Sequence, residues 1–182
     1  MKWLALFVAA LLVVAACSVG CTDEEEAPPA EPPVEIQPGQ VLVGYGDVTG
    51  TGQLSGSLSS GTIDTITVTV GLAPGHESVD MEDIAVVYAD AIRTESLIPV
   101  EGFRGEPPQG TWGIIDVIDQ VGNQNNRLDD KEKFVIRINP KSPLVPRQLI
   151  TISIKPKDGQ PLTIRRVSPS TIKQEGNILA PV

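Results

Sequence analysis

The sequence has few of the residues on which disulfide bonding, metal binding and acid–base catalysis usually depend. Its 182 residues include 2 cysteines and 1 histidine. Both cysteines, Cys17 and Cys21, lie near the N-terminus, so the body of the chain has neither a disulfide framework nor a cysteine metal site. The lone histidine, His76, falls in a turn-like stretch and is better explained as a surface residue than as a catalytic base.

Nucleophile and phosphate-binding motifs are also missing. No G-x-S-x-G sequence occurs. The glycine-rich stretches 44–46 and 49–52 lack the following helix and the lysine of a phosphate-binding loop, and we interpret them as flexible β-turns. No pair of carboxylates has a context that marks an acid–base couple. We therefore expect no enzymatic activity, no catalytic residue and no organic cofactor.

Basic residues are scarce relative to acidic ones. The chain has 14 lysines and arginines against 23 aspartates and glutamates, a formal net charge of −9 at pH 7. A nucleic-acid-binding protein needs basic residues to neutralise phosphates, so this balance argues against that class. Aromatic residues are also scarce, whereas valine, isoleucine, threonine and glycine abound, a composition typical of short strands joined by turns.

The N-terminus has the pattern of an export signal. Lys2 supplies a short positive start, and residues 3–16 form an uncharged, almost wholly apolar run suited to a secretory signal. The run ends in V-A-A-C, which resembles a lipobox with Cys17 as the lipid attachment point; Cys21 is a weaker candidate. The alternatives are an uncleaved anchor with two unmodified thiols and a local disulfide. Lipidation and an uncleaved anchor both leave the domain tethered outside the membrane.

The chain divides into three parts. Residues 1–21 are the predicted leader or membrane anchor. Residues 22–39 combine an acidic run with a proline-rich stretch, which favours an extended, solvated stalk. Residues 40–182 are the predicted folded domain.

Short runs of alternating apolar and polar residues characterise this domain. In residues 65–72, Ile66, Val68, Val70 and Leu72 share one face of an extended chain and threonines occupy the other. Clusters of glycine, proline and asparagine between such runs indicate turns. Further strands are expected at residues 41–45, 84–88, 112–118, 133–138, 150–155 and 162–165.

Strands with one apolar face each bury those faces most economically against a second sheet. We therefore predict an all-β fold, an immunoglobulin-like antiparallel β-sandwich, preceded by the apolar N-terminal helix or signal segment. The cysteine and tryptophan spacing of antibody domains is absent, so the prediction concerns architecture alone.

One segment is rich in hard oxygen ligands. Asp119, Asn123, Asn125, Asp129 and Glu132 crowd around a short loop, and Ca²⁺ takes about six to eight oxygens in flexible geometry. The loop lacks the D-x-D-x-D-G register of an EF-hand. Calcium is the candidate metal, and the alternative is an asparagine-rich turn capped by side-chain hydrogen bonds.

Three pieces of the sequence resemble the archaeal flagellins, or archaellins. The first, residues 61–75, reads G-T-I-D-T-I-T-V-T-V-G-L-A-P-G and is followed by an acidic loop and a strand ending in Tyr88. The second, residues 125–136, is an asparagine-rich loop that runs into E-K-F. The third, residues 154–164, is similar to the family's closing hairpin. The likeness extends over residues 61–167.

The resemblance implies a β-sandwich outer domain with a structural role. Its implied partners are other archaellin-like subunits or surface-layer and envelope proteins. In the family, this domain stands on a long apolar helix that bundles into the filament core after a basic leader is cleaved. This chain has only Lys2 before its apolar run, and cleavage at Cys17 would remove that helix.

Two functions are therefore considered. The first is an archaellin-like structural or interaction protein at the outer face of the archaeal cell membrane, either a filament component or an archaellum-associated envelope protein involved in motility. The second is a surface lipoprotein that binds a ligand, a glycan or a surface-layer partner and has no motility role.

Overall fold

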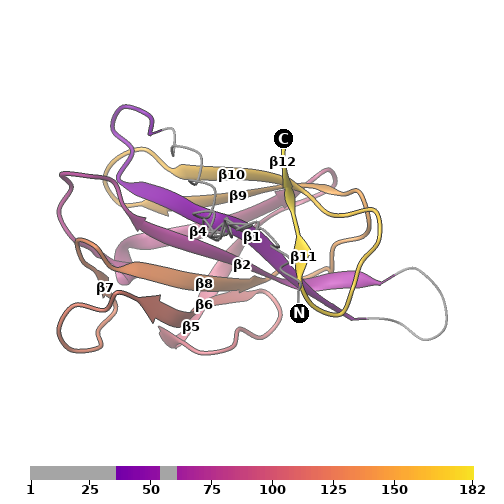
Figure 1. Ribbon diagram of the computed structural model, residues 1–182, viewed down its shortest axis with the longest axis horizontal. Coiled ribbons are helices and arrows are strands. Elements are labelled where there is room, and N and C mark those ends of the chain that lie inside the picture. The colour runs from indigo at the N-terminus through magenta and orange to yellow at the C-terminus, as the bar shows by residue number, and fades with distance from the viewer. Residues whose placement is uncertain (1–35, 54–60) are drawn as a thin grey trace, which may run out of the picture. The chain divides into compact units, whose positions relative to one another are not determined.

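The computed structural model describes residues 36–53 and 61–182 (Figure 1). The predicted leader and most of the predicted stalk lie outside these ranges. No helix in this part of the chain is long and apolar enough to cross a membrane. One 3-10 turn, η1 (Met81–Asp83), accompanies the strands, which are β1 (Leu42–Gln53), β2 (Thr62–Leu72), β3 (Val79–Asp80), β4 (Ile84–Asp90), β5 (Thr94–Arg104), β6 (Thr111–Ile118), β7 (Arg127–Leu128), β8 (Lys133–Asn139), β9 (Leu149–Pro156), β10 (Leu162–Val167), β11 (Asn177–Ile178) and β12 (Ala180–Pro181).

The strands form two layers that one strand connects (Figure 1). Ten strands are hydrogen-bonded in the order β11-β1-β2-β8-β6-β5-β4-β9-β10-β12, and β3 pairs with β7 separately. The first half of β5 pairs with β4 and its second half with β6, so β5 passes from one layer to the other. Every strand pairing is antiparallel except β5 with β6, which is parallel. The predicted all-β fold is confirmed.

The two layers enclose one hydrophobic core. Ile66, Val68 and Val70 of β2 are at most 1% exposed, as their alternation predicted. In the register, Val68 lies opposite Ile136 of β8, which is also buried. Burial of one such side chain contributes about 1.5–3 kcal/mol, so the same alternation that defines the strands drives the layers together.

The glycine-rich stretches of β1 are strand rather than turn, and the prediction of flexible turns there is wrong. Gly50 and Gly52 both lie in the ladder between β1 and β2. A Cβ on Gly50 would lie 2.6 Å from Cγ2 of Ile63, and a Cβ on Gly52 would lie 2.6 Å from the carbonyl oxygen of Thr62. Glycine is needed here because neighbouring atoms approach closely. Between the two stretches the register shifts and β1 bulges.

Strand β5 has no clear alternating pattern in the sequence. Pro99 lies in its middle, and Gly102 and Phe103 have positive φ angles of 69° and 63°. The register of β5 with β6 shifts between Pro99 and Arg104, which marks an irregularity in the strand. Proline and glycine usually indicate turns, so alternation alone did not identify this strand.

Candidate functional site

The structure places His76 at the surface and leaves the two cysteines outside its range. His76 is exposed, and its backbone N–H donates to the carbonyl of Ala73 at 3.2 Å, within a turn. Cys17 and Cys21 precede residue 36 and are outside the described residues. Lipidation at either cysteine therefore stays a prediction.

The oxygen-rich loop is held by Glu132. This side chain is only 3% exposed, and its two carboxylate oxygens accept different backbone N–H groups. Oε1 accepts from Val121 at 2.5 Å, and Oε2 accepts from Asp129 at 3.3 Å. Glu132 therefore ties both arms of the loop between β6 and β8 to one buried anchor.

The other predicted ligands also contact protein groups. Asp119 lies 3.8 Å from the ammonium of Lys133. The side-chain oxygen of Asn125 accepts the backbone N–H of Arg127 at 2.8 Å, and Asp129 lies 3.8 Å from the guanidinium of Arg127.

The remaining predicted ligand, Asn123, is exposed. In residues 36–53 and 61–182, no three His, Cys, Asp or Glu side chains are grouped as metal ligands. Calcium binding by the oxygen-rich loop, which includes asparagine oxygens, stays a prediction.

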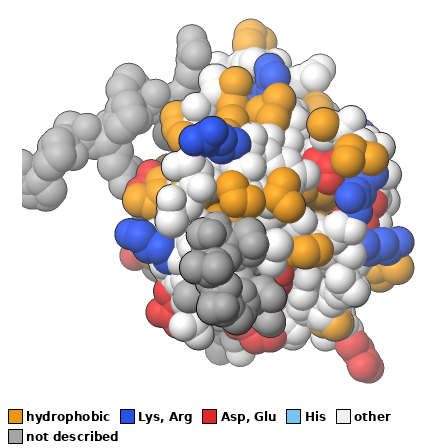
Figure 2. Space-filling model, turned by 90° about the vertical axis from the view of Figure 1, so that its right-hand side faces the viewer, with side chains coloured by type: hydrophobic (Ala, Val, Ile, Leu, Met, Phe, Trp, Pro, Cys, Tyr) orange, Lys and Arg blue, Asp and Glu red, His pale blue; other side chains and the backbone are white. Residues whose placement is uncertain are grey.

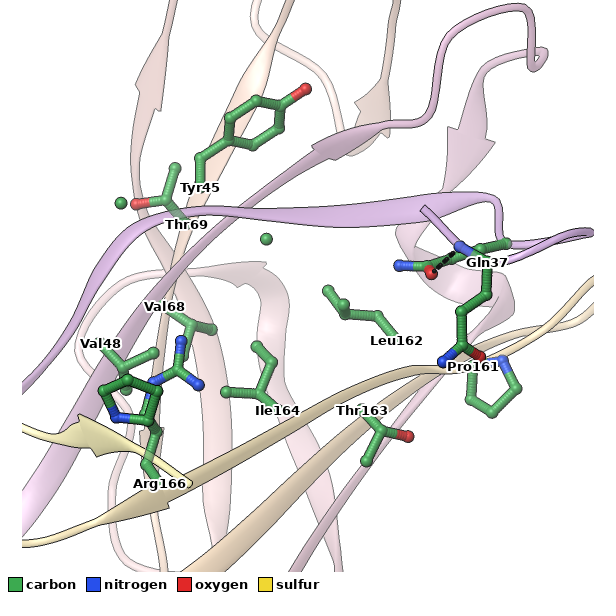
Figure 3. A pocket seen from close by; sticks show the side chains of 14 residues that line it. Gln37, Tyr45, Val48, Val68, Thr69, Pro161, Leu162, Thr163, Ile164 and Arg166 are labelled. Atoms are coloured by element: carbon green, nitrogen blue, oxygen red, sulfur yellow. Dashed lines mark hydrogen bonds between the residues drawn. The ribbon is translucent and has the colours of Figure 1, made fainter. Parts of the chain in front are cut away.

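Strands β1 and β10, each next to a terminal strand of the ten-stranded order, face each other across a seam. At one end of the seam, the backbone N–H of Gln160 donates to the carbonyl of Gly39 at 2.8 Å. At the other end, the short C-terminal strands β11 and β12 pair with β1 and β10. No ladder joins β1 to β10 in the described chain, and a groove of about 540 Å³ lies between them (Figure 3). We call it the seam groove.

The seam groove has an apolar floor and one cation. Its floor includes Val48 of β1, Val68 of β2, and Leu162 and Ile164 of β10, all buried. Arg166 follows Leu162 and Ile164 at spacing two and therefore shares their inward face. Its side chain extends from β10 toward β1, beside Val48 and Val68 (Figure 3). Arg166 is not among the site residues predicted from the sequence, although its phase in β10 was a visible signal.

Among the described residues, little compensates the charge of Arg166. Its Nη1 donates to the carbonyl of Arg165 at 2.9 Å. None of the ion pairs found in the described residues includes Arg166. Burial lowers the pKa of the Arg166 guanidinium, and the negative charge of Asp47 partly opposes this effect. The groove thus contains a half-buried cation that can accept an anionic partner.

Polar contacts fix the turn between β4 and β5 at the end where β1 finishes. Asp90 accepts the backbone N–H groups of Ile92 and Arg93 at 2.8 and 2.9 Å, and it pairs with the Arg93 guanidinium at 3.2 Å. Burial raises the pKa of the nearby Tyr88, and the charge of Asp90 adds to this. The Tyr88 hydroxyl has no hydrogen-bond partner in the described structure. A buried tyrosine with a raised pKa is suited to packing rather than to proton transfer.

The same end exposes several apolar side chains. Ile92 is 84% exposed, Val145 is 52% exposed and Leu149 is 41% exposed. Figure 2 looks onto this end and shows hydrophobic side chains scattered among polar ones. Singly exposed apolar residues are common on protein surfaces, so this scatter alone does not define a docking patch.

The sandwich has counterparts among known proteins. Residues 45–166 match the family described as archaeal-type flagellin. The crystal structure of archaeal flagellin FlaB1 from Methanocaldococcus jannaschii is similar at 14% identity and a TM-score of 0.55, covering 75% of this chain and 95% of that one. The archaeal flagellum of Methanospirillum hungatei strain JF1 is similar at 15% identity and a TM-score of 0.52, covering 76% and 70%. No match to a curated protein sequence was found.

Proposed function

Since the chain belongs to the archaeal-type flagellin family, we propose that it is an archaellin-like structural protein of the archaeal cell surface. It serves either as a filament component or as an envelope protein associated with the archaellum. Family membership confirms the resemblance found in residues 61–167, and the family is structural rather than enzymatic.

The observation that carries this proposal is the extent of the family match. Residues 45–166 begin within β1 and end within β10, so the match spans both layers of the sandwich rather than one shared hairpin. The match therefore concerns the sandwich as a whole. It supports a role for the sandwich as a surface element that contacts neighbouring proteins.

The N-terminal sequence bears on which of the two roles applies. The apolar run 3–16 is short for a filament-core helix and is followed by Cys17 and a proline-rich stretch, and proline removes helical hydrogen bonds. These features favour a tethered envelope protein that accompanies the filament. Cys17 is also the feature that favours the alternative, a surface lipoprotein that binds a ligand without a role in motility.

A deletion strain and isolated filaments separate these possibilities. We expect the chain to co-purify with archaella sheared from wild-type cells, and we expect the deletion strain to swim poorly. Complementation with the intact gene is the control and should restore swimming. A deletion strain that assembles archaella and swims normally would refute the motility role and leave the ligand-binding lipoprotein.

A further inference from the structure

We propose that the seam groove is a docking site for an extended acidic peptide segment of another protein chain. A carboxylate of this segment pairs with Arg166, and its backbone pairs with the edge of β1 that faces away from β2 at Gly44. The inference rests on the groove itself and holds whether or not the chain serves the archaellum.

The position of Arg166 is the first reason. The inward face of β10 carries Leu162 and Ile164, which are 7% and 6% exposed, before it reaches Arg166. A guanidinium at an inward position loses hydration and is retained at low cost only when an anion and hydrogen-bond acceptors replace the lost water. Its planar donors suit a carboxylate, which they can bind through two parallel hydrogen bonds.

The open edge of β1 is the second reason. The Gln40 side-chain amide donates to the carbonyl of Leu42 at 2.7 Å. In the regular ladder this carbonyl lies on the edge of β1 that faces away from β2. Gly44 lies two residues further along, so its backbone groups face the same way. Among the described strands Gly44 pairs only with Val70 of β2, and a Cβ on Gly44 would meet only Ile164, at 3.8 Å, on the face that lines the groove. An extended peptide can therefore add to this edge by backbone hydrogen bonds.

The direction of the strands admits such a peptide. The bridge between Gln40 and Gln160 is parallel, so β1 and β10 leave it in the same direction. A strand between them would be antiparallel to both, the arrangement with the better hydrogen-bond geometry. Residues 44–47 and 162–165 offer four positions each, a length of about 13 Å at about 3.3 Å per residue. Beyond them the C-terminal segment closes the seam, because the Leu179 N–H donates to the carbonyl of Val48 at 2.9 Å and Pro181 pairs with Arg166.

The contacts of Gln40 favour a segment from another chain over residues that directly precede the groove in this one. Its Oε1 accepts the N–H of Gln37 at 3.0 Å while its Nε2 binds Leu42. If the chain folded back along β1 from the turn at residues 37–40, the resulting strand would use these two backbone groups in its first hydrogen bonds. The Gln40 side chain already satisfies them.

The test uses the intact chain and a capped synthetic peptide, Ser-Val-Glu-Val-Ser, with Ser-Val-Gln-Val-Ser as its matched neutral control. We expect the glutamate peptide to protect the Gly44 amide from hydrogen exchange. We expect it to bind at least about tenfold more tightly than the neutral peptide, since hydrogen bonds to charged groups are among the stronger ones. Because both peptides meet the same wild-type protein, this comparison does not depend on the folding of any variant.

Two protein variants locate the charge that the peptide contacts. R166Q should weaken binding of the glutamate peptide to the level of the neutral peptide. R165Q is the matched control, because Arg165 is exposed on the outer face of the same strand, and it should change the affinity less than about twofold.

Three results would overturn the proposal. Equal weakening by R165Q and R166Q would mean that the peptide binds a diffuse positive surface. Displacement of the peptide by sulfate with no backbone protection at Gly44 would mean a simple anion site. Protection of the Gly44 amide before any peptide is added would mean that the groove is already filled, by this chain if the protection is independent of protein concentration and by a second copy if it is not.

Discussion

Replacing Glu132 by alanine is expected to lower the melting temperature of the sandwich by several degrees. The Glu132 carboxylate is 3% exposed and accepts backbone N–H groups of Val121 and Asp129 at 2.5 and 3.3 Å. A hydrogen bond to a charged group contributes about 1.5–3 kcal/mol, and the longer of the two bonds lies at the low end. E132A should therefore cost about 3–4.5 kcal/mol, or roughly 6–18 °C for a domain of this size.

The assay is thermal unfolding followed by circular dichroism, with two matched variants. E132Q keeps the size of the side chain but has one acceptor oxygen, so it should lose about half as much stability as E132A. D130A removes an exposed neighbouring carboxylate and should change the melting temperature by less than about 2 °C. Equal melting temperatures for E132A and D130A would refute the role of Glu132 as the anchor of the loop.

The same samples test the predicted calcium site. Calcium bound by the oxygen-rich loop would raise the melting temperature of the wild-type chain at about 1 mM Ca²⁺, the range of weak extracellular sites. The increase should disappear in E132A, because Glu132 is one of the predicted ligands. An equal effect of calcium on both proteins would remove Glu132 from the ligand set.

Three further predictions concern packing, titration and tethering. G52A should lower the free energy of unfolding by about 1–3 kcal/mol, because its Cβ would lie 2.6 Å from a backbone oxygen of β2. G44A should cost far less, because the nearest neighbour of its Cβ would be 3.8 Å away. Equal denaturant midpoints for the two variants would contradict the close packing of β1. The raised pKa of Tyr88 means that the folded state disfavours tyrosinate, so wild-type stability should fall above about pH 10 by up to about 1.4 kcal/mol per pH unit. Y88F should lack this alkaline loss of stability, and identical alkaline unfolding curves for wild type and Y88F would refute the prediction. If lipid at Cys17 tethers the protein, C17S should release the domain into the medium, and full membrane retention of C17S would exclude this tether.

The strands were predictable where the alternation of residues within one strand decides which side chains face the core. The alternation around Ile66, Ile136 and Ile152 assigns each of these residues to an inward face, and all three are buried. The prediction failed where sequence distance is large. Gly52 is in a strand because a backbone oxygen of β2 and another near the C-terminus approach it, and the residues around Gly52 contain no signal of those contacts.

The candidate sites show the same division. The inward phase of Arg166 could be read from Leu162 and Ile164, but the groove exists because β1 and β10, far apart in the sequence, meet without pairing. Glu132 is one of several carboxylates in its loop, and its burial depends on how the chain between β6 and β8 closes. Local composition therefore identified an oxygen-rich loop without identifying Glu132 as its buried anchor.

Gold-labelled antibodies against the sandwich, applied to intact archaeal cells and viewed by electron microscopy, give the most direct test of a surface role beside the archaellum. We predict that the gold lies along the archaella or at their bases. Labelling that is uniform over the envelope and unrelated to archaella, or that appears only after the cells are permeabilised, would contradict the proposed function.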